Sequence, residues 1–315
     1  MLTPSSAQAL ARLRAYKPPP TQWYNCPLTR RAAVLILLFP DRYGELKVVL
    51  TMRASTLRSY AGQAALPGGK SDTLTETPFD TARREASEEI GLPTTDTKLP
   101  PGFRVEHLCE LPSHLAKTEL GVRPCVAFLC PSNPSSSSSE SSNLDVEEKM
   151  IPRLDPKEVA AVFTAPFHNF LRSNWDSAGP GPCNKTGQPH SWYRGSWTDW
   201  YESRWRMHNF YIPKPPPSSP SARIKTPSPP SNDAESKSAI SPFEDLSTFR
   251  VFGMTARILV DAARVAYDEQ PDFEHNNHFG DEEMIERLLK MGRLGEIRRK
   301  GEEIAKEVLR EASKI

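Results

Sequence analysis

The chain has 315 residues, 37% of them hydrophobic, so it is long enough and apolar enough to bury a sizeable core. Its 40 basic and 39 acidic residues nearly cancel, and this balance gives no sign of a nucleic-acid-binding or membrane-surface protein. No apolar run is long enough to span a bilayer, the N-terminus lacks a secretory apolar segment, and 31 prolines predict long irregular segments within one domain.

The first predicted element is a helix over residues 5–16, SSAQALARLRAY, which ends before the proline run at 18–20. We expect residues 1–29 to form a helical extension that packs outside the core. Two apolar runs follow, RAAVLILLF at 31–39 and LKVVLTMR at 46–53, joined by a DRYGE turn. They predict a hairpin of buried strands.

The segment after this hairpin, LTMRASTLRSYAGQAALPGGK at 50–70, combines arginines with glycines. Arginine supplies a planar guanidinium fork for phosphate groups, and glycine allows close approach of the backbone. The candidate substrate-binding residues are therefore Arg53, Arg58, Gly68 and Gly69. An ordinary basic connection between a strand and a loop is the alternative interpretation.

The stretch GGKSDTLTETPFDTARREASEEIGL at 68–92 carries helix signals at both ends. Thr77 can cap the helix, Pro78 suits its first position, and Gly91 stops it. Its apolar residues recur at i, i+3, i+7 and i+11, a stripe that can lie on a sheet. They are Phe79, Ala82, Ala86 and Ile90.

Three carboxylates stand beside this stripe, at i, i+3 and i+4: Glu85, Glu88 and Glu89. Like charges repel there, and a hard divalent cation such as Mg²⁺ or Mn²⁺ removes the repulsion by binding carboxylate oxygens. Arg84 can pair with one of the acids and hold its rotamer. The three glutamates are thus candidate metal ligands, and a solvated acidic helix face is the alternative.

This segment resembles the Nudix box, a loop-helix-loop in which a glycine and an REUxEExGU run recur, U being an aliphatic residue. The run here is REASEEIGL. Gly69 and Arg84 stand one residue farther apart than in the general box, and the expected upstream glutamate falls at Thr75 or Glu76. The same longer spacing, and the similarity of 50–70 to an LTxRSxxLRxHxGQxxxPGGK signature, resemble the coenzyme A diphosphatase branch. A tyrosine stands near the position where that branch often has histidine.

The resemblance implies an α/β fold, a Nudix α/β/α sandwich with a mixed sheet, over residues 30–270, with Pro/Ser-rich insertions near 131–143 and 213–242. It implies hydrolysis of the diphosphate of coenzyme A or its thioesters to 3′,5′-ADP and 4′-phosphopantetheine or its acylated form. Mg²⁺ or Mn²⁺ would be the cofactor, and the catalytic residues would be Glu85, Glu88, Glu89 and Arg84. Hydrolysis of oxidised or ordinary nucleoside triphosphates and a non-catalytic Nudix binding module are the alternatives.

Further strands are predicted downstream. Two of these strands are FRVEHLCEL at 103–111 and VRPCVAFLC at 122–130. The segment 155–171 predicts a strand and a turn before a short helix. Glu158 in that segment is either a further metal ligand or base, or a solvent-facing strand residue. Residues 249–267, FRVFGMTARILVDAARVAY, predict a strand end that passes into an amphipathic helix.

Five tryptophans fall within residues 175–211. They either stack an adenine or cover a pantetheine arm, or they belong to a hairpin that packs its own small core. The chain's cysteines show no CxxC pair, and their odd number leaves one over in any disulfide scheme, so reduced thiols are predicted and a zinc site is not. They are Cys26, Cys109, Cys125, Cys130 and Cys183.

Residues 271–315 are expected to form a charged, solvated helical extension with one apolar side, made of Met284, Ile285, Leu288 and Leu289. The chain ends in Ser313-Lys314-Ile315, which differs from the peroxisomal SKL address only by isoleucine for leucine. Several coenzyme A diphosphatases are peroxisomal. The resemblance and the tripeptide together indicate a peroxisomal location and recognition by the peroxisomal import receptor, with a cytoplasmic location as the alternative.

Overall fold

The computed structural model describes residues 2–53, 62–131, 146, 159–176, 191–200, 203–214, 248–297, 308, 311 and 312. Several predictions therefore lie outside the described residues. They concern Arg58, Glu158, Cys183, nearly all of the two Pro/Ser-rich insertions, and the tripeptide Ser313-Lys314-Ile315.

The centre of the molecule is an eight-stranded mixed sheet. Its strands are β1 (Arg31–Pro40), β2 (Leu46–Arg53), β3 (Ala64–Ala65), β4 (Gly68–Lys70), β5 (Phe103–Glu110), β6 (His114–Leu115), β7 (Gly121–Pro131) and β8 (Val159–Pro166). The main order is β3-β2-β1-β7-β5, while β4 pairs with β1, β6 with β7 and β8 with β2. The β1–β7 pair is parallel, and the predicted β1–β2 hairpin is antiparallel.

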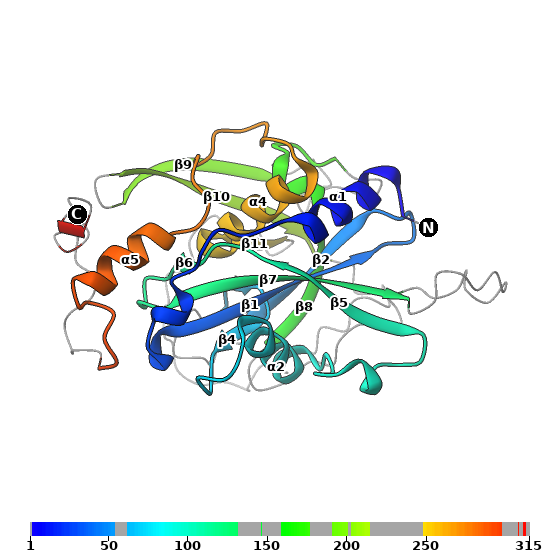
Figure 1. The fold of residues 1–315 in the computed structure, drawn as a ribbon. Coiled ribbons are helices and arrows are strands. Elements are labelled where there is room, and N and C mark those ends of the chain that lie inside the picture. The colour runs from blue at the N-terminus through cyan, green and yellow to red at the C-terminus, as the bar shows by residue number, and fades with distance from the viewer. Residues whose placement is uncertain are drawn as a thin grey trace, which may run out of the picture.

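Helices cover both faces of this sheet (Figure 1). Helix α2 (Pro78–Ile90) lies on one face, while α1 (Pro4–Ala15) and α4 (Gly253–Tyr267) lie on the other. Alternate side chains of β1 pack against the helices on opposite faces of the sheet, because successive residues of a strand point to opposite faces. Leu35 and Leu37 pack with α2, and Ile36 and Leu38 pack with α1 and α4. The predicted α/β/α sandwich is confirmed.

A second sheet of three strands packs against α4 (Figure 1). Its order is β11-β10-β9, with β9 (Tyr193–Trp200), β10 (Ser203–Pro213) and β11 (Thr248–Phe252). The hairpin β9–β10 does not pack a small core of its own, because Trp192 and Phe210 join the main core with α1 and α4. The residues that the structure describes also form helix α5 (Glu282–Lys290) and short 3₁₀ helices at Trp23–Asn25, Leu28–Arg30, Asp96–Lys98 and His168–Leu171.

Two expectations about the chain ends are wrong. Helix α1 belongs to the core, since Ala9, Leu10 and Leu13 are buried in the cluster that contains α4. Helix α5 is not a solvated extension, since Ile285 and Leu288 are fully buried. Both helices are amphipathic, and an amphipathic pattern predicts that one face is covered without saying which distant segment covers it.

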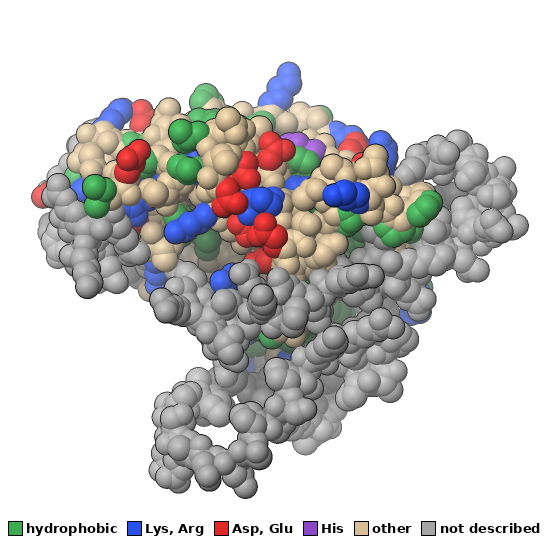
Figure 2. All heavy atoms as spheres, turned by 90° about the horizontal axis from the view of Figure 1, so that it is seen from below, with side chains coloured by type: hydrophobic (Ala, Val, Ile, Leu, Met, Phe, Trp, Pro, Cys, Tyr) green, Lys and Arg blue, Asp and Glu red, His purple; other side chains and the backbone are tan. Residues whose placement is uncertain are grey.

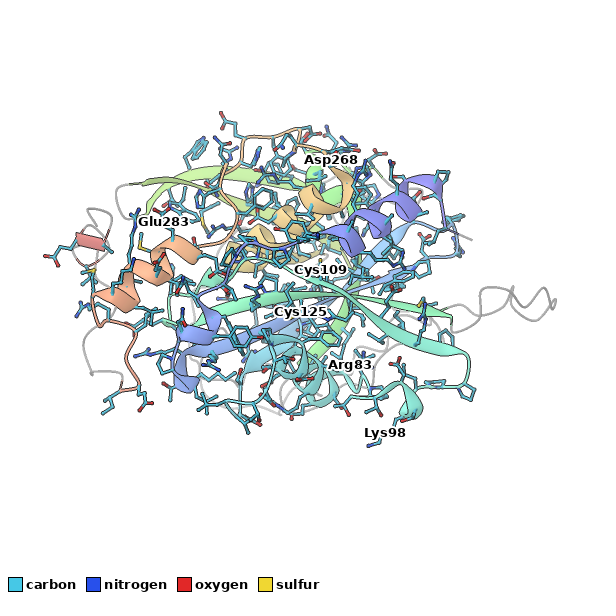
Figure 3. The ribbon with its side chains drawn as sticks, viewed as in Figure 1. Arg83, Lys98, Cys109, Cys125, Asp268 and Glu283 are labelled. Carbon is cyan, nitrogen blue, oxygen red and sulfur yellow. The ribbon has the colours of Figure 1, made fainter. Side chains whose placement is uncertain are left out.

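The four described cysteines, Cys26, Cys109, Cys125 and Cys130, are free and buried, as expected for reduced thiols. Cys109 and Cys125 lie on the neighbouring strands β5 and β7 (Figure 3). Burial raises the pKa of the Cys26 thiol to about 11 and that of Cys109 to about 12. The thiols are therefore protonated at neutral pH and act as small apolar groups. In the described part of the chain, no helix combines the length and the hydrophobicity needed to cross a membrane.

A buried ion pair joins the segment before β1 to the turn between β6 and β7. Arg30 Nη1 lies 2.6 Å from Glu119 Oε2, and the two residues are only 4% and 5% exposed. We expect Arg30→Met to lower the free energy of unfolding by about 3 kcal/mol, because it leaves a buried carboxylate without its counter-charge. Urea denaturation measures the loss. Arg14→Met, which breaks an exposed pair with Glu106, should cost less than about 1 kcal/mol, and equal losses would contradict the prediction.

A buried histidine makes stability depend on pH. His208 on β10 is 2% exposed, its Nδ1 lies 3.0 Å from the hydroxyl of Tyr193, and burial lowers its pKa from 6.5 to about 4. Between these values the unfolded chain binds more protons than the folded chain, so stability falls as pH drops through this window. We expect wild type to lose about 3 kcal/mol more than His208→Asn between pH 7 and pH 4 in urea denaturation. Superimposable pH profiles would rule the effect out.

Candidate active site

Helix α2 begins and ends where the sequence predicts. Thr77 Oγ1 accepts a hydrogen bond from the backbone N–H of Asp80, whose side chain accepts one from the N–H of Thr77 in return. This reciprocal capping box satisfies two donors that a helix start otherwise leaves without partners. At the other end Gly91 adopts a left-handed conformation with φ of 69°. The apolar stripe of the helix lies on the sheet, and the acidic flank stands beside it, with Glu89 buried and Glu88 exposed.

The two glycines that precede α2 leave space that other atoms of the protein occupy. A Cβ on Gly68 would lie 2.3 Å from the carbonyl oxygen of Ala33, so the glycine allows β4 to approach β1. A Cβ on Gly69 would lie 2.5 Å from the carboxylate carbon of Glu85. The backbone N–H of Gly68 also donates to Glu89 Oε2 at 3.1 Å. The carboxylates of Glu85 and Glu89, one turn apart on α2, therefore both face this loop.

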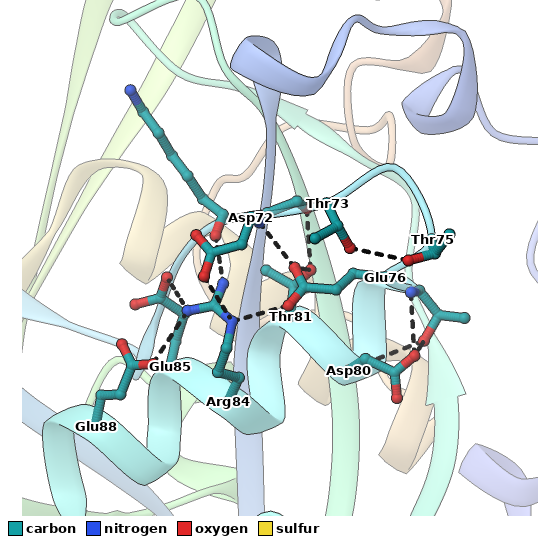
Figure 4. Close-up of polar contacts among 12 residues, drawn as sticks. Asp72, Thr73, Thr75, Glu76, Asp80, Thr81, Arg84, Glu85 and Glu88 are labelled. Carbon is teal, nitrogen blue, oxygen red and sulfur yellow. Dashed lines mark hydrogen bonds and ion pairs between the residues drawn. The ribbon is translucent and has the colours of Figure 1, made fainter.

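Arg84 organises the acidic flank of α2 (Figure 4). Its guanidinium donates to Glu76 Oε1 at 2.8 Å, to Glu85 Oε1 at 3.1 Å and to Glu88 Oε1 at 3.3 Å. It also donates to the carbonyl oxygen of Lys70 at 2.7 Å, which ties α2 to β4. Burial alone would lower the pKa of Arg84, but Glu76 and Glu85 raise it overall. Its Nε also lies 3.4 Å from Asp72 Oδ2, so Arg84 pairs with four carboxylates, where the sequence predicted one.

Glu76 is a site residue that the sequence left undecided. Of the two candidates for the upstream glutamate position, Thr75 bonds only locally to Thr73, whereas Glu76 binds Arg84 and accepts from the N–H of Asp72 at 2.9 Å and the hydroxyl of Thr81 at 3.0 Å. Partial burial raises its pKa, but the bonds from Arg84, Asp72 and Thr81 outweigh burial and lower the pKa below its usual value. The pairing with arginine, eight residues away, is the signal that identifies Glu76.

The three predicted glutamates differ in how deeply they are buried beside the Gly68–Gly69 loop. Glu89 is buried and its Oε1 lies 3.8 Å from Arg53 Nη1, so α2 and the end of β2 meet there. The Glu85 side chain is 15% exposed, and that of Glu88 is 55% exposed on the outer side of Arg84. Seen from the α2 side of the molecule, acidic side chains gather around basic ones (Figure 2).

The donor set fits a hard divalent cation. Glu85 and Glu89 supply carboxylate oxygens on one side of the Gly68–Gly69 loop, and the gap at Gly69 accommodates the Glu85 carboxylate. Arg84 restricts the rotamers of Glu85 and Glu88 as an outer partner of the site. Within the described residues, no three His, Cys, Asp or Glu side chains form a preassembled ligand group. The assignments of Glu85, Glu88 and Glu89 as metal ligands stay predictions.

A cleft with a volume of about 1160 Å³ opens from this loop. Arg53 and Gly68 line it beside Glu89, and Trp205, Met207 and Met284 line it on the side of β10 and α5. One tryptophan of the 175–211 segment therefore faces the cleft, while Trp192 lies in the core. Sequence reasoning missed the contribution of α5 because it interpreted this helix as an extension.

Comparison with known proteins agrees with this architecture. A NUDIX domain model matches residues 29–129. The chain is 31% identical over 173 residues to an uncharacterized Nudix hydrolase, NudL, of Cronobacter sakazakii, a match covering 55% of this chain and 73% of that protein. The chain belongs to the Nudix hydrolase family.

Within this family the chain is similar to the peroxisomal coenzyme A diphosphatase 1 of Saccharomyces cerevisiae, with 38% identity over 166 residues, 51% of this chain and 48% of that protein. It is also similar to the mitochondrial Nudix hydrolase 15 of Arabidopsis thaliana, with 30% identity over 244 residues, 78% of this chain and 61% of that protein. The matches thus span about half to three fifths of these two relatives.

Proposed function

We propose that the protein hydrolyses the diphosphate bond of coenzyme A or its thioesters, releasing 3′,5′-ADP and 4′-phosphopantetheine or its acylated form. The observation that carries this proposal is the meeting of Glu85 and Glu89 at the Gly68–Gly69 loop, beside a cleft lined by Gly68 and Arg53, both of which contact Glu89. The cleft, at about 1160 Å³, exceeds the roughly 300–1,000 Å³ of ordinary small-molecule pockets, as an elongated substrate requires. Similarity to the Saccharomyces protein supports the choice of coenzyme A.

Mg²⁺ or Mn²⁺ is the proposed cofactor, held by Glu85 and Glu89 with Glu88 assisting, and when bound it would neutralise phosphate charge and activate water. Side chains of the protein orient the carboxylates, bind the diphosphate and accept the proton. Arg84 holds the carboxylates in position. Arg53, at the cleft wall, offers its guanidinium to the diphosphate. A carboxylate of the site accepts the proton of the attacking water, as general base catalysis requires.

Mass spectrometry of the products tests the proposal. Purified protein is incubated with coenzyme A and Mg²⁺ in ¹⁸O-labelled water. We expect 4′-phosphopantetheine and 3′,5′-ADP, with the label in the fragment whose phosphorus was attacked. Turnover of 8-oxo-dGTP without turnover of coenzyme A would assign the protein to nucleoside triphosphates instead. A folded protein inactive on both would correspond to a binding module.

A peroxisomal location is the second part of the proposal. Its support is the name of the Saccharomyces relative and the tripeptide Ser313-Lys314-Ile315, although the Arabidopsis relative is named mitochondrial. A fluorescent protein fused in front of this chain should collect in peroxisomes, and removing the tripeptide should disperse it. A mitochondrial signal from the intact fusion would contradict this location.

A further inference from the structure

The walls of the cleft come from segments that lie far apart in the chain. One wall is the turn at 112–117 around β6, the second is the start of α4, the third is the start of α5, and the fourth is β10 with Trp205. Because long stretches of chain separate these segments, contacts between side chains must fix their relative positions and therefore the width of the cleft.

A single carboxylate, on the residue directly before α5, contacts two of the other walls. Asp281 Oδ2 accepts hydrogen bonds from the backbone N–H of Leu115 at 2.9 Å and from Arg257 Nη1 at 2.9 Å, and its Oδ1 accepts one from Arg257 Nη2 at 3.0 Å. Burial alone would raise the pKa of Asp281, but Arg257, His114 and the N–H of Leu115 together lower it below its usual value. The carboxylate is therefore charged at neutral pH, and both of its oxygens are bonded within the protein.

The backbone beside Asp281 lies equally close to the turn at 112–117. The N–H of Asp281 donates to the carbonyl oxygen of Ser113 at 2.7 Å, and Arg257 Nη2 donates to the carbonyl oxygen of Gly280 at 2.8 Å. A Cβ on Gly280, at a φ of 61°, would lie only 2.8 Å from the same Ser113 oxygen. Glycine thus allows an approach that places the Asp281 side chain between the turn and α4.

The guanidinium that Asp281 holds also contacts the fourth wall. Arg257 lies 4.2 Å from the ring centroid of Trp205, and a cation over an aromatic face is attracted by the ring. Asp281 fixes the position of this guanidinium with two hydrogen bonds, and the guanidinium in turn packs on the indole. The turn at 112–117, α4, α5 and β10 are therefore linked through one carboxylate.

We infer that Asp281 is a positioning residue for the proposed reaction, which fixes the spacing of the cleft walls through Leu115 and Arg257 and so determines how tightly the substrate is held. This inference rests on the proposed function and extends it beyond the carboxylates of α2. The printed contacts of Asp281 all lie in the cleft walls, away from Glu85 and Glu89. It therefore acts on binding that is common to the ground state and the transition state, and such binding sets KM rather than kcat.

The test is Asp281→Asn, assayed with coenzyme A and Mg²⁺. Asparagine has the size of aspartate but only one acceptor oxygen. With that oxygen on the N–H of Leu115, its NH₂ group faces Arg257 Nη2, another donor, so the guanidinium loses its place over Trp205. We expect KM to rise roughly tenfold, kcat to change by less than about twofold, and Mn²⁺ affinity, measured by titration, to stay the same.

Asp96→Asn is the matched control. Asp96 makes the same two kinds of contact, since it accepts from the backbone N–H of Val105 at 3.2 Å and lies 3.5 Å from Arg83, but it is not among the described residues that line the cleft. Its KM and kcat should equal those of wild type.

A second variant, Arg257→Gln, removes the guanidinium that Asp281 holds and should raise KM to a similar extent. The double variant Asp281→Asn with Arg257→Gln should be no worse than either single variant, because all three lose the same contact. If Asp281→Asn does not fold, the KM of Arg257→Gln decides the inference.

The possible results separate the inference from the proposed function. An unchanged KM in folded Asp281→Asn would overturn the inference, and so would a lower KM, which would show that the released guanidinium binds substrate directly. Effects on KM that add in the double variant would also overturn it. Failure of wild type to hydrolyse coenzyme A would overturn the proposed function; turnover of 8-oxo-dGTP instead would let the same KM comparison decide the inference, and no turnover of either would overturn both.

Discussion

Replacing Glu89 by glutamine is expected to lower kcat/KM for coenzyme A on the order of 10³-fold while leaving the fold intact. Glutamine keeps an oxygen that can accept the hydrogen bond from the backbone N–H of Gly68. It removes the negative charge that a divalent cation requires. Loss of roughly 4 kcal/mol of transition-state charge stabilisation corresponds to about a thousandfold in rate.

Steady-state kinetics measures this loss, and Mn²⁺ titration of the folded variant measures metal affinity, which should fall as well. Glu106→Gln is a suitable control, because Glu106 is a carboxylate paired with Arg14 outside the site, and its removal should leave both quantities unchanged. Full activity in folded Glu89→Gln would defeat the assignment of Glu89 as a metal ligand.

Gly69→Ala should lower activity by about 10–100-fold with little effect on stability. The new Cβ would lie 2.5 Å from the carboxylate carbon of Glu85, at the far end of a flexible side chain, so the carboxylate can move aside. The fold then loses less than about 1 kcal/mol, but a displaced ligand lowers metal affinity and rate. Kinetics, Mn²⁺ titration and urea denaturation of one preparation separate these effects.

Gly68→Ala is the matched comparison, because the adjacent glycine should respond in the opposite way. Its Cβ would lie 2.3 Å from the carbonyl oxygen of Ala33 and 2.6 Å from Val34 Cα, both backbone atoms of β1, at a φ of 154°. Backbone atoms of a central strand cannot move aside cheaply, so we expect a loss of about 4 kcal/mol in unfolding free energy. Equal stability of the two alanine variants would show that the two glycines do not have these separate roles.

The candidate site shows where sequence reasoning works and where it stops. Thr77, Pro78 and Gly91 determine the ends of α2, because capping depends on residues within one turn of the helix. The stripe of Ala82, Ala86 and Ile90 determines which face is buried, since helical periodicity is also local. The acidic flank carrying Glu85 and Glu89 follows from these two facts.

The residues that contact this acidic flank could not be predicted from the sequence. The contact of Arg84 with Glu76 depends on how the loop between β4 and α2 returns to the helix, and the contact of Gly69 with Glu85 depends on the register of β4 against β1. Spacing alone left Thr75 and Glu76 as equal candidates, because the loop's conformation decides which of them reaches the arginine.

The sequence by itself determined the Nudix-type loop and helix, the strands at 31–39, 46–53, 103–111 and 122–130, and the family to which they belong, because these depend on local patterns. Only the tertiary structure decided that α1 is part of the core and that α5 and β10 line the cleft. The physical reason is that burial is a property of pairs of segments. An apolar face requires a cover, and segments more than a hundred residues away in the chain supply it here.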